Sequence, residues 1–461
     1  MKQLIHGGRV LTAGRLGGEH ADVLIEDDTI LAVLPAGESV SDDARRIDAT
    51  NRLLIPGLVN AHTHATVHLS KAMADRWSLE LLLNAYPWTA GGRTLEYKYL
   101  SAFIGAVEMV RKGCTACYDL VAEIPAPSVE GIEAVARAYN DVGMRAVIAP
   151  MMADVSFYRA IPGLLDAIPP PLRERAAAIS LNPFDVTLAT CRQLLAKWSW
   201  DRDRLRPALG PTIPHHCTDA FIIGCRDLAK EHGIGVQMHV AESKVQAVVG
   251  VKRYGTTLVG HLHRLGLLAP NFTAAHAIWL DDDDIGRLAD AGASVAHNPG
   301  SNLKLGSGLA ATRKFRDRGV TFGIGTDGCI SSDNLNMFEA MRMAAFLHKL
   351  QSRDPRVVSA KEALQMATIG GARALGMERQ IGSLERGKRA DLIVVGMSAA
   401  RQTPMYDPIS HLVYVTRGDD VRTTIVNGKV LMRDRKMLTL NEPAILQEAR
   451  GWADKVRAAV R

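Results

Sequence analysis

Short apolar runs alternate with longer stretches of helical periodicity through most of this chain. Eight of these runs have the length of strands and are bounded by turn residues, which is typical of strands buried on both faces. They cover residues 58–64, 114–120, 144–152, 206–212, 235–242, 272–280, 293–299 and 320–328. The stretches between them have helical patterns, as in residues 100–112, 129–142 and 220–232. Because alternating strands and helices build a parallel sheet, the pattern predicts an α/β fold with a (β/α)8 TIM-like barrel over residues 57–377.

The two ends of the chain have a different pattern from the middle. Residues 1–56 and 378–461 contain short alternating segments separated by turn residues, which is typical of β-structure. Asn427-Gly428 lies between two apolar runs and is a common hairpin turn. We therefore expect the two ends to meet in one small β-sandwich domain beside the barrel, followed by a terminal helix from about residue 442.

The composition is that of an ordinary globular enzyme, with 47% apolar and 23% charged residues in a chain of 461. The net charge of +6 comes from basic residues scattered among acidic ones, so we expect no nucleic-acid partner. No window approaches the roughly 18 apolar residues of a membrane span, and the first residues lack a signal-peptide pattern. The six cysteines are widely spaced, as reduced thiols are, and the sequence predicts a cytoplasmic location without membrane contact.

Histidines and acids gather at the C-terminal ends of the predicted strands. His62 and His64 end the first strand, and their spacing of two residues puts both imidazoles on one face. Later strand ends carry His239, Glu242, His276, His297 and Asp327. Parallel barrels collect their active sites at this end, and neutral imidazoles and carboxylates are ligands for zinc or iron. The pattern therefore predicts a metal site at the mouth of the barrel.

Several stretches, in this order, resemble the motifs of the amidohydrolase superfamily. They are Pro56-Gly-Leu-Val-Asn-Ala-His-Thr-His64, His239-Val-Ala-Glu242, Ala275-His276, His297-Asn-Pro-Gly-Ser-Asn-Leu-Lys-Leu305, Gly325-Thr-Asp-Gly328 and Gly382-Ser-Leu-Glu-Arg-Gly-Lys-Arg-Ala-Asp391. The resemblance covers nearly the whole chain. It is to the branch that includes methylthioadenosine/S-adenosylhomocysteine deaminases, guanine and cytosine deaminases, and triazine hydrolases.

The resemblance implies a role for each residue at the strand ends. The implied metal ligands are His62, His64, His239 and Asp327, and the implied catalytic residues are Glu242, His276 and Asp327. Asp327 would accept the proton of the attacking water, Glu242 would carry protons to the substrate, and His276 would stabilise charge on the attacking oxygen. Related binuclear enzymes use a lysine in strand four, and residues 206–212 contain none, so one divalent metal is expected, zinc before iron.

The implied activity is that of a metal-dependent hydrolase acting on non-peptide carbon–nitrogen bonds. We expect a cyclic-amidine deaminase that attacks an aminated purine, pyrimidine, pterin or triazine with metal-bound hydroxide and releases ammonia. One alternative expels chloride or an alkylamine from a triazine-like ring, and another cleaves an amide or urea-like bond. A non-catalytic binding protein is the remaining alternative, and the intact set of ligands argues against it. The expected partner is a small heterocyclic substrate, and the resemblance allows a homodimer or larger homo-oligomer.

The substrate pocket departs from the pattern of nucleoside deaminases in this branch. Tyr86-Pro-Trp-Thr89 has no acid where that pattern places one to contact ribose, and Thr212 stands where a histidine usually faces the substrate. The aromatics near Tyr86 either stack on a heterocycle or form a helix face packed on the barrel. His215 and His216 either line the pocket or cap the next helix. The candidate pocket residues are His68, Trp77, Trp88, Thr212, His215, His216, His297, Asn298 and Ser301.

Overall fold

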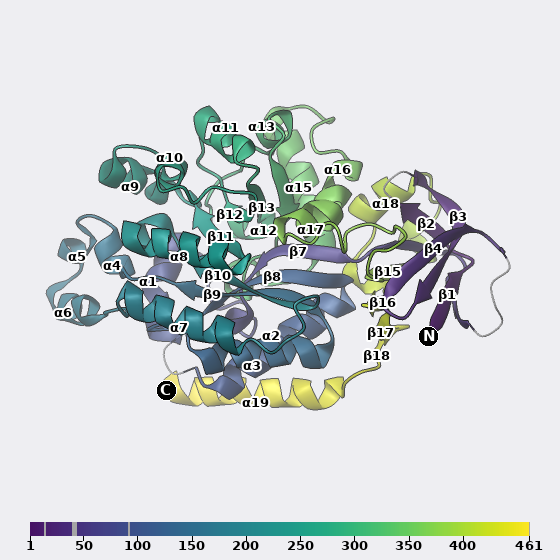
Figure 1. Ribbon diagram of the computed structural model, residues 1–461, viewed down its shortest axis with the longest axis horizontal. Coiled ribbons are helices and arrows are strands. Elements are labelled where there is room, and N and C mark those ends of the chain that lie inside the picture. Colours follow the sequence, from purple (N-terminus) through teal and green to yellow (C-terminus); the bar gives the residue numbers. More distant parts are fainter. Residues whose placement is uncertain (13–14, 39–43, 91–92, 461) are drawn as a thin grey trace.

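The computed structural model describes residues 1–12, 15–38, 44–90 and 93–460, and eight parallel strands form its centre (Figure 1). Each strand pairs with the next along the chain. The strands are β7 (Leu58–Thr63), β8 (Cys114–Ala122), β9 (Arg145–Met152), β10 (Leu205–Pro211), β11 (Gly235–Val240), β12 (Phe272–His276), β13 (Ser294–His297) and β14 (Thr321–Ile324). The Asp327 amide after β14 donates to the His62 carbonyl of β7 at 2.9 Å, which nearly closes the ring. The predicted (β/α)8 barrel is therefore confirmed.

Helices follow the strands and cover the outside of the barrel (Figure 1). Several begin where a Ser or Thr side chain accepts from a free amide of the first turn, as Thr94, Ser128 and Thr218 do. The helices of this part are α1 (Leu79–Ala90), α2 (Leu95–Arg111), α3 (Val129–Val142), α4 (Phe157–Ala160), α5 (Leu164–Ala167), α6 (Pro170–Ala178), α7 (Phe184–Lys197), α8 (Asp219–His232), α9 (Lys244–Tyr254), α10 (Leu258–Arg264), α11 (Asp282–Asp290), α12 (Pro299–Lys304), α13 (Thr312–Asp317), α14 (Cys329–Ser332), α15 (Met337–Ser352), α16 (Ala360–Gln365) and α17 (Gly371–Ala374), with short turns η1 (Ala65–Val67), η2 (Pro214–His216) and η3 (Met366–Gly370).

Both ends of the chain contribute to a second, mixed sheet of ten strands. Its strands are β1 (Lys2–His6), β2 (Arg9–Thr12), β3 (Arg15–Glu26), β4 (Thr29–Pro35), β5 (Arg45–Asp48), β6 (Arg52–Pro56), β15 (Leu392–Gly396), β16 (Val421–Val426), β17 (Lys429–Arg433) and β18 (Lys436–Met437). β6 joins the two ends because it pairs with β2 on one side and antiparallel with β15 on the other. Helix α18 (Pro408–Tyr414) follows β15, and α19 (Glu442–Val460) ends the described chain.

A buried ion pair connects this sheet to the barrel. Arg145, at the start of β9, has 0% of its side chain exposed, and its Nε donates to the Asp391 carboxylate beside β15 at 2.9 Å. The same guanidinium donates to Asn427 Oδ1 at 3.0 Å, in the turn between β16 and β17. The buried charges of Arg145 in the barrel and Asp391 beside the sheet are therefore paired only when the two parts are packed together. No helix in the described part of the chain is both long and apolar enough to cross a membrane.

Candidate metal centre and substrate cavity

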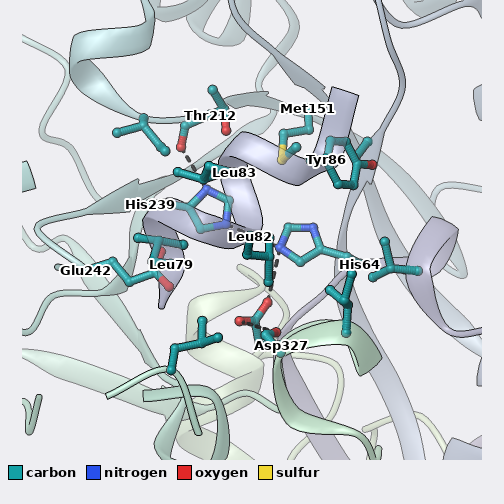
Figure 2. Close-up of a pocket in the computed structure, with 16 residues that line it drawn as sticks. His64, Leu79, Leu82, Leu83, Tyr86, Met151, Thr212, His239, Glu242 and Asp327 are labelled. Carbon is teal, nitrogen blue, oxygen red and sulfur yellow. Dashed lines mark hydrogen bonds and ion pairs between the residues drawn. The ribbon is translucent and has the colours of Figure 1, made fainter. Parts of the chain in front are cut away.

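Three imidazoles and one carboxylate meet at the C-terminal mouth of the barrel. His62 and His64 come from the end of β7, His239 from β11, and Asp327 from the turn after β14. Asp327 Oδ1 lies 3.4 Å from His62 Nε2 and 3.2 Å from His64 Nε2. His64 Nε2 is in turn 3.2 Å from His239 Nε2. The four side chains thus surround one point, towards which Figure 2 shows His64, His239 and Asp327 directed.

The second nitrogen of each imidazole is fixed by an oxygen acceptor. The pairs are His62 Nδ1 with Gln237 Oε1 at 2.6 Å, His64 Nδ1 with the Leu120 carbonyl at 2.8 Å, and His239 Nδ1 with the Thr212 carbonyl at 2.8 Å. Because a carbonyl or amide oxygen can only accept, each Nδ1 carries the proton and each Nε2 lone pair faces the common point. The Gln237 amide also donates to the Ala61 carbonyl at 3.0 Å, so its own orientation is fixed.

Asp327 is held as an ionised carboxylate. Its Oδ1 accepts from the Gly328 amide at 2.7 Å, and its Oδ2 accepts from Ser331 Oγ at 2.9 Å. These two donors favour the ionised form of the carboxylate. The backbone of Asp327, in the turn that follows β14, has φ of +60°.

This donor set fits a divalent metal ion. The Nε2 atom of His62 is buried and has no hydrogen-bond partner among the described residues, although a buried polar atom normally has one. Ligands arranged tetrahedrally around zinc lie roughly 3.3 Å apart, the separation found between the Asp327 oxygen and the two imidazole nitrogens of β7. Candidate ligand atoms of His62, His64 and His239 all lie within 4.8 Å of one another, as do those of His62, His276 and Asp327.

Glu242 and His276 lie beside the four proposed ligands, and His276 also forms a close group with His62 and Asp327. The Glu242 carboxylate is 3% exposed and lies 3.6 Å from His276 Nε2. Burial, with Asp327 and Glu80 nearby, raises the pKa of Glu242 well above its usual range, so the carboxyl can hold a proton near neutral pH. His276 Nδ1 is 2.9 Å from Asn302 Oδ1, and its Nε2 lies 4.0 Å from Asp327 Oδ2. His276 therefore lies within contact distance of both Glu242 and the donor set.

A cavity of about 90 Å³ opens beside these polar side chains, and most of its wall is apolar (Figure 2). One side is helix α1, which contributes Leu79, Leu82, Leu83 and Tyr86. The other lining residues are His64, Val67, Ala122, Met151, Thr212, Ile213, His239, Glu242, Leu305, Asp327, Ile330 and Ser331. Such a cavity suits a flat, weakly polar molecule whose reacting atom faces Glu242 and Asp327.

Thr212 is the one predicted pocket position among the described residues that line this cavity. His216 lines a second cavity of about 110 Å³, which shares Leu83, Tyr86, Met151 and Thr212 with the first. His215 is 1% exposed in η2, where its carbonyl accepts from Arg253. The structure therefore places only one of these two histidines next to the space that adjoins the site.

Tyr86 of the predicted aromatic loop lines the cavity, whereas His68 and Trp77 have packing roles. His68 is buried behind the site, with Nε2 3.1 Å from Thr63 Oγ1, and burial lowers the pKa of its imidazole to about 3. Trp77 is half-buried against an apolar cluster that contains Val67 and Leu79. The side chain of Trp88 lies outside the described residues.

Three of the predicted pocket residues lie at the end of β13 and just after it. His297 Nε2 is 3.1 Å from His348 Nε2, a contact between two buried rings. Asn298 and Ser301 are each 0% exposed, and their side-chain polar atoms have no hydrogen-bond partner in the described chain. A Cβ on Gly325 would meet Asn298 Oδ1 at 2.2 Å, so this loop packs directly against the turn that carries Asp327.

Sequence reasoning missed two groups of residues. The α1 leucines form the cavity wall, whereas a run such as Leu79–Leu83 is ordinarily assigned to a helix face packed on the barrel. Gln237 in β11 and Asn302 in α12 hold His62 and His276, and the signal for Gln237 is a polar side chain inside an apolar strand. Buried amides of this kind are the outer partners that metal-site histidines require.

Comparison with known proteins gives the same picture over the full length. Residues 53–431 match the model of the amidohydrolase family. A 5'-deoxyadenosine deaminase of Methanosarcina mazei is 35% identical over 99% of both chains, and a 5-methylthioadenosine/S-adenosylhomocysteine deaminase of Syntrophobacter fumaroxidans is 35% identical over 98% of both. An adenosine deaminase from Xanthomonas campestris with bound zinc has a TM-score of 0.88, at 30% identity over 99% of this chain and 98% of that one. Atrazine chlorohydrolase from Arthrobacter aurescens, complexed with zinc, has a TM-score of 0.86, at 25% identity over 97% and 99%.

Proposed function

The chain belongs to the amidohydrolase family, and from this premise we propose that it is a zinc-dependent aminohydrolase of aminated nitrogen heterocycles, aminopurines first. The observation that carries the proposal is the convergence of His62, His64, His239 and Asp327 next to a buried Glu242 on an apolar cavity. Relatives 35% identical to nearly the whole chain are named as deaminases of adenosine derivatives, which supports the purine class. In this proposal the first four side chains are the metal ligands.

The roles of the residues follow from their positions. When bound, a divalent ion supplies a Lewis acid that lowers the pKa of a water molecule towards neutrality. Asp327 would accept one proton of the attacking water as the oxygen of that water adds to the amino-bearing carbon, and Glu242 would give its proton to the adjoining ring nitrogen. The amino group then takes the proton from Asp327 and leaves as ammonia, while the second water proton passes to Glu242. Burial raises the pKa of Glu242 and so favours the protonated form with which this cycle begins.

In this proposal His276 stabilises the negative charge that develops on the attacking oxygen. This role requires a proton on its Nε2, which in turn requires Nδ1 to accept a hydrogen bond. The oxygen and nitrogen of an asparagine amide are assigned from their contacts, and turning Asn302 by 180° would present its NH2 group to Nδ1. Asn302 Nδ2 has no partner in the described chain as it stands, so this turn would also satisfy that atom.

Ammonia release from a substrate panel tests the proposal. The panel contains 5'-deoxyadenosine, methylthioadenosine, guanine, an aminopterin and an aminotriazine, each with zinc-loaded protein. We expect release from one class, loss of at least about 100-fold in Glu242→Gln, and unchanged zinc content in that variant. Glu130→Gln, at an exposed position in the first turn of α3, is the matched control. Normal turnover by Glu242→Gln would refute the assignment of the proton carrier.

A second activity is favoured by the lining of the cavity. Leu79, Leu82 and Ile330 offer no partner for ribose hydroxyls, but they suit the alkyl groups of a substituted triazine. The solved triazine hydrolase neighbours share the fold at 25% identity. Release of chloride or an alkylamine from such a ring by the zinc-loaded protein, with no ammonia from the panel, would refute the leaving group of the first proposal. That result would leave its assignment of the metal ligands unchanged.

Metal identity has its own test. Apoprotein is reloaded with zinc or with ferrous iron, and bound metal and ammonia release are measured together. We expect one equivalent of zinc to restore turnover, since three imidazoles and a carboxylate suit zinc. Higher turnover per bound metal with iron would contradict the choice of zinc.

A further inference from the structure

A cavity of about 550 Å³ lies at the N-terminal end of the barrel strands, away from the metal centre. Pro207 and Gly235 border it from the beginnings of β10 and β11, and Arg373 and Gly376 border it from α17 and the turn after it. Strand β11 runs from this cavity to His239, so the two spaces lie at opposite ends of one strand. None of the proposed catalytic residues lines it within the described chain.

The charged groups of this cavity carry an excess of positive charge. Its basic side chains are those of Arg202, Arg206 and Arg373. The one acid that lines it, Asp203, is already paired with Arg389 and accepts from Gln380 at 3.2 Å.

The three guanidinium groups differ in how they are held. Arg206 donates only to neutral oxygens, among them the Gly376 carbonyl at 3.0 Å. Arg202 and Arg373 are exposed and have no carboxylate partner among the described residues. Burial and the nearby guanidinium of Arg145 lower the pKa of Arg206, and the carboxylates of Asp203 and Glu378 offset this shift only in part.

A buried hydroxyl with no partner lines the same cavity. Tyr118 is 2% exposed, and its hydroxyl makes no hydrogen bond with any described residue. A Cβ on Gly235 would come within 3.1 Å of this oxygen, so the hydroxyl lies directly against the Gly235 backbone, which borders the cavity. Buried hydroxyls are almost always paired, and an unpaired one costs free energy. An oxyanion in the cavity would supply the missing acceptor.

We propose that this cavity is a binding site for a small organic anion that carries a phosphate or carboxylate group. The guanidinium groups would bind the oxyanion, since their paired N–H donors match phosphate and carboxylate oxygens. The Tyr118 hydroxyl would donate to the same group. Val147, Ile234 and Leu375 give the cavity an apolar wall, and its volume is in the range of organic-ligand sites, so a carbon skeleton fits beside the charge. This site is independent of the proposed deaminase activity.

Isothermal titration of the metal-loaded protein tests the proposal with two probes. Ribose 5-phosphate represents phosphomonoesters without an amino-bearing ring, and succinate represents carboxylates. We expect saturable binding of at least one probe, and the stronger binder identifies the anionic group. The dissociation constant should rise at least about tenfold in Tyr118→Phe, which removes only the hydroxyl, and in the double variant Arg202→Gln/Arg373→Gln.

Arg379→Gln/Arg386→Gln is the matched control, because it removes the same charge from exposed positions outside the cavity lining. This control should bind the probes as the wild type does. Absence of saturable binding with both probes would overturn the proposal. So would equal binding by the wild type and Tyr118→Phe, or equal weakening by the cavity and control arginine pairs, since the latter would mean non-specific attraction. Deaminase turnover measured on the same samples shows that each variant is folded.

Discussion

Replacing Gln237 by leucine should weaken metal binding at the mouth of the barrel by roughly 10- to 100-fold, the usual effect of removing an outer partner of a ligating histidine. Gln237 is 0% exposed, and its oxygen lies 2.6 Å from His62 Nδ1. Leucine has a similar size but cannot accept a hydrogen bond. His62 would then be free to rotate or to change tautomer, and its Nε2 would no longer be directed at the metal.

The same substitution should also destabilise the apoprotein. It leaves His62 Nδ1 and the Ala61 carbonyl without their partner, and each buried unpaired group costs about 1–3 kcal/mol. Gln402→Leu is the matched control, because Gln402 is 1% exposed and donates to the Gly396 carbonyl at 3.0 Å, far along the chain from the barrel mouth. Both variants should lose a similar free energy of unfolding.

The assay is zinc affinity, measured by competition with a chromophoric chelator, together with urea unfolding of each apoprotein. Gln237→Glu supplies the rescue, since a carboxylate also accepts from His62 Nδ1 and should restore zinc binding. If Gln237→Leu bound zinc as tightly as Gln402→Leu does, the hydrogen bond to His62 would have no part in holding the metal, and the reasoning would fail.

Three further predictions concern stability. Arg145→Met should lower the free energy of unfolding, measured in urea, by about 3–5 kcal/mol, because it leaves the Asp391 carboxylate charged and buried. Adding Asp391→Leu should recover part of this loss. A loss below about 1 kcal/mol in Arg145→Met would contradict the prediction. Burial would raise the pKa of Glu108, but Lys112 and Lys71 lower it from 4.5 to about 2, so its ionised form stabilises the fold above about pH 4.5. That contribution, about 3 kcal/mol, should disappear as the pH falls towards 2. The difference in free energy of unfolding between wild type and Glu108→Gln, measured in urea, should therefore become smaller from pH 6 to pH 3. A difference that stays constant over this range would refute the prediction. Removing the metal with dipicolinate should abolish ammonia release and lower the Tm, and added zinc should restore both. If the apoprotein and the zinc-loaded protein had the same Tm, the ion would not bind the folded state preferentially.

The strands of the barrel could be predicted from the sequence because each is an apolar run of strand length between helical stretches. Their C-terminal ends were less well predicted. The predicted strands 272–280, 293–299 and 320–328 extend beyond the observed ends at His276, His297 and Ile324. At the end of β12 the physical reason is a left-handed backbone, with φ of +68° at His276. His276 is not a glycine, so the residue type gives no signal of that turn.

The polar side chains of the candidate site were accessible to sequence reasoning, whereas the cavity wall was not. Histidine and acid residues at strand ends are rare enough to stand out. Leu82 and Ile330 resemble core residues, because an apolar side chain that lines a cavity has the same pattern as one that packs in the interior. Which apolar face meets a ligand depends on how α1 lies on the barrel, and that is decided by contacts between segments far apart in the sequence.

The pairing of β6 with β15 has a consequence for the order in which the protein is made. β6 leads directly into the strand that carries His62, and one of its edges is covered by residues synthesised roughly 340 positions later. At ribosomal speeds that edge stays unpaired for on the order of tens of seconds. All four proposed metal ligands leave the ribosome within that interval, since the last of them is Asp327. A nascent chain stopped before residue 392 would therefore contain the complete donor set but lack the strand that supports its first histidine.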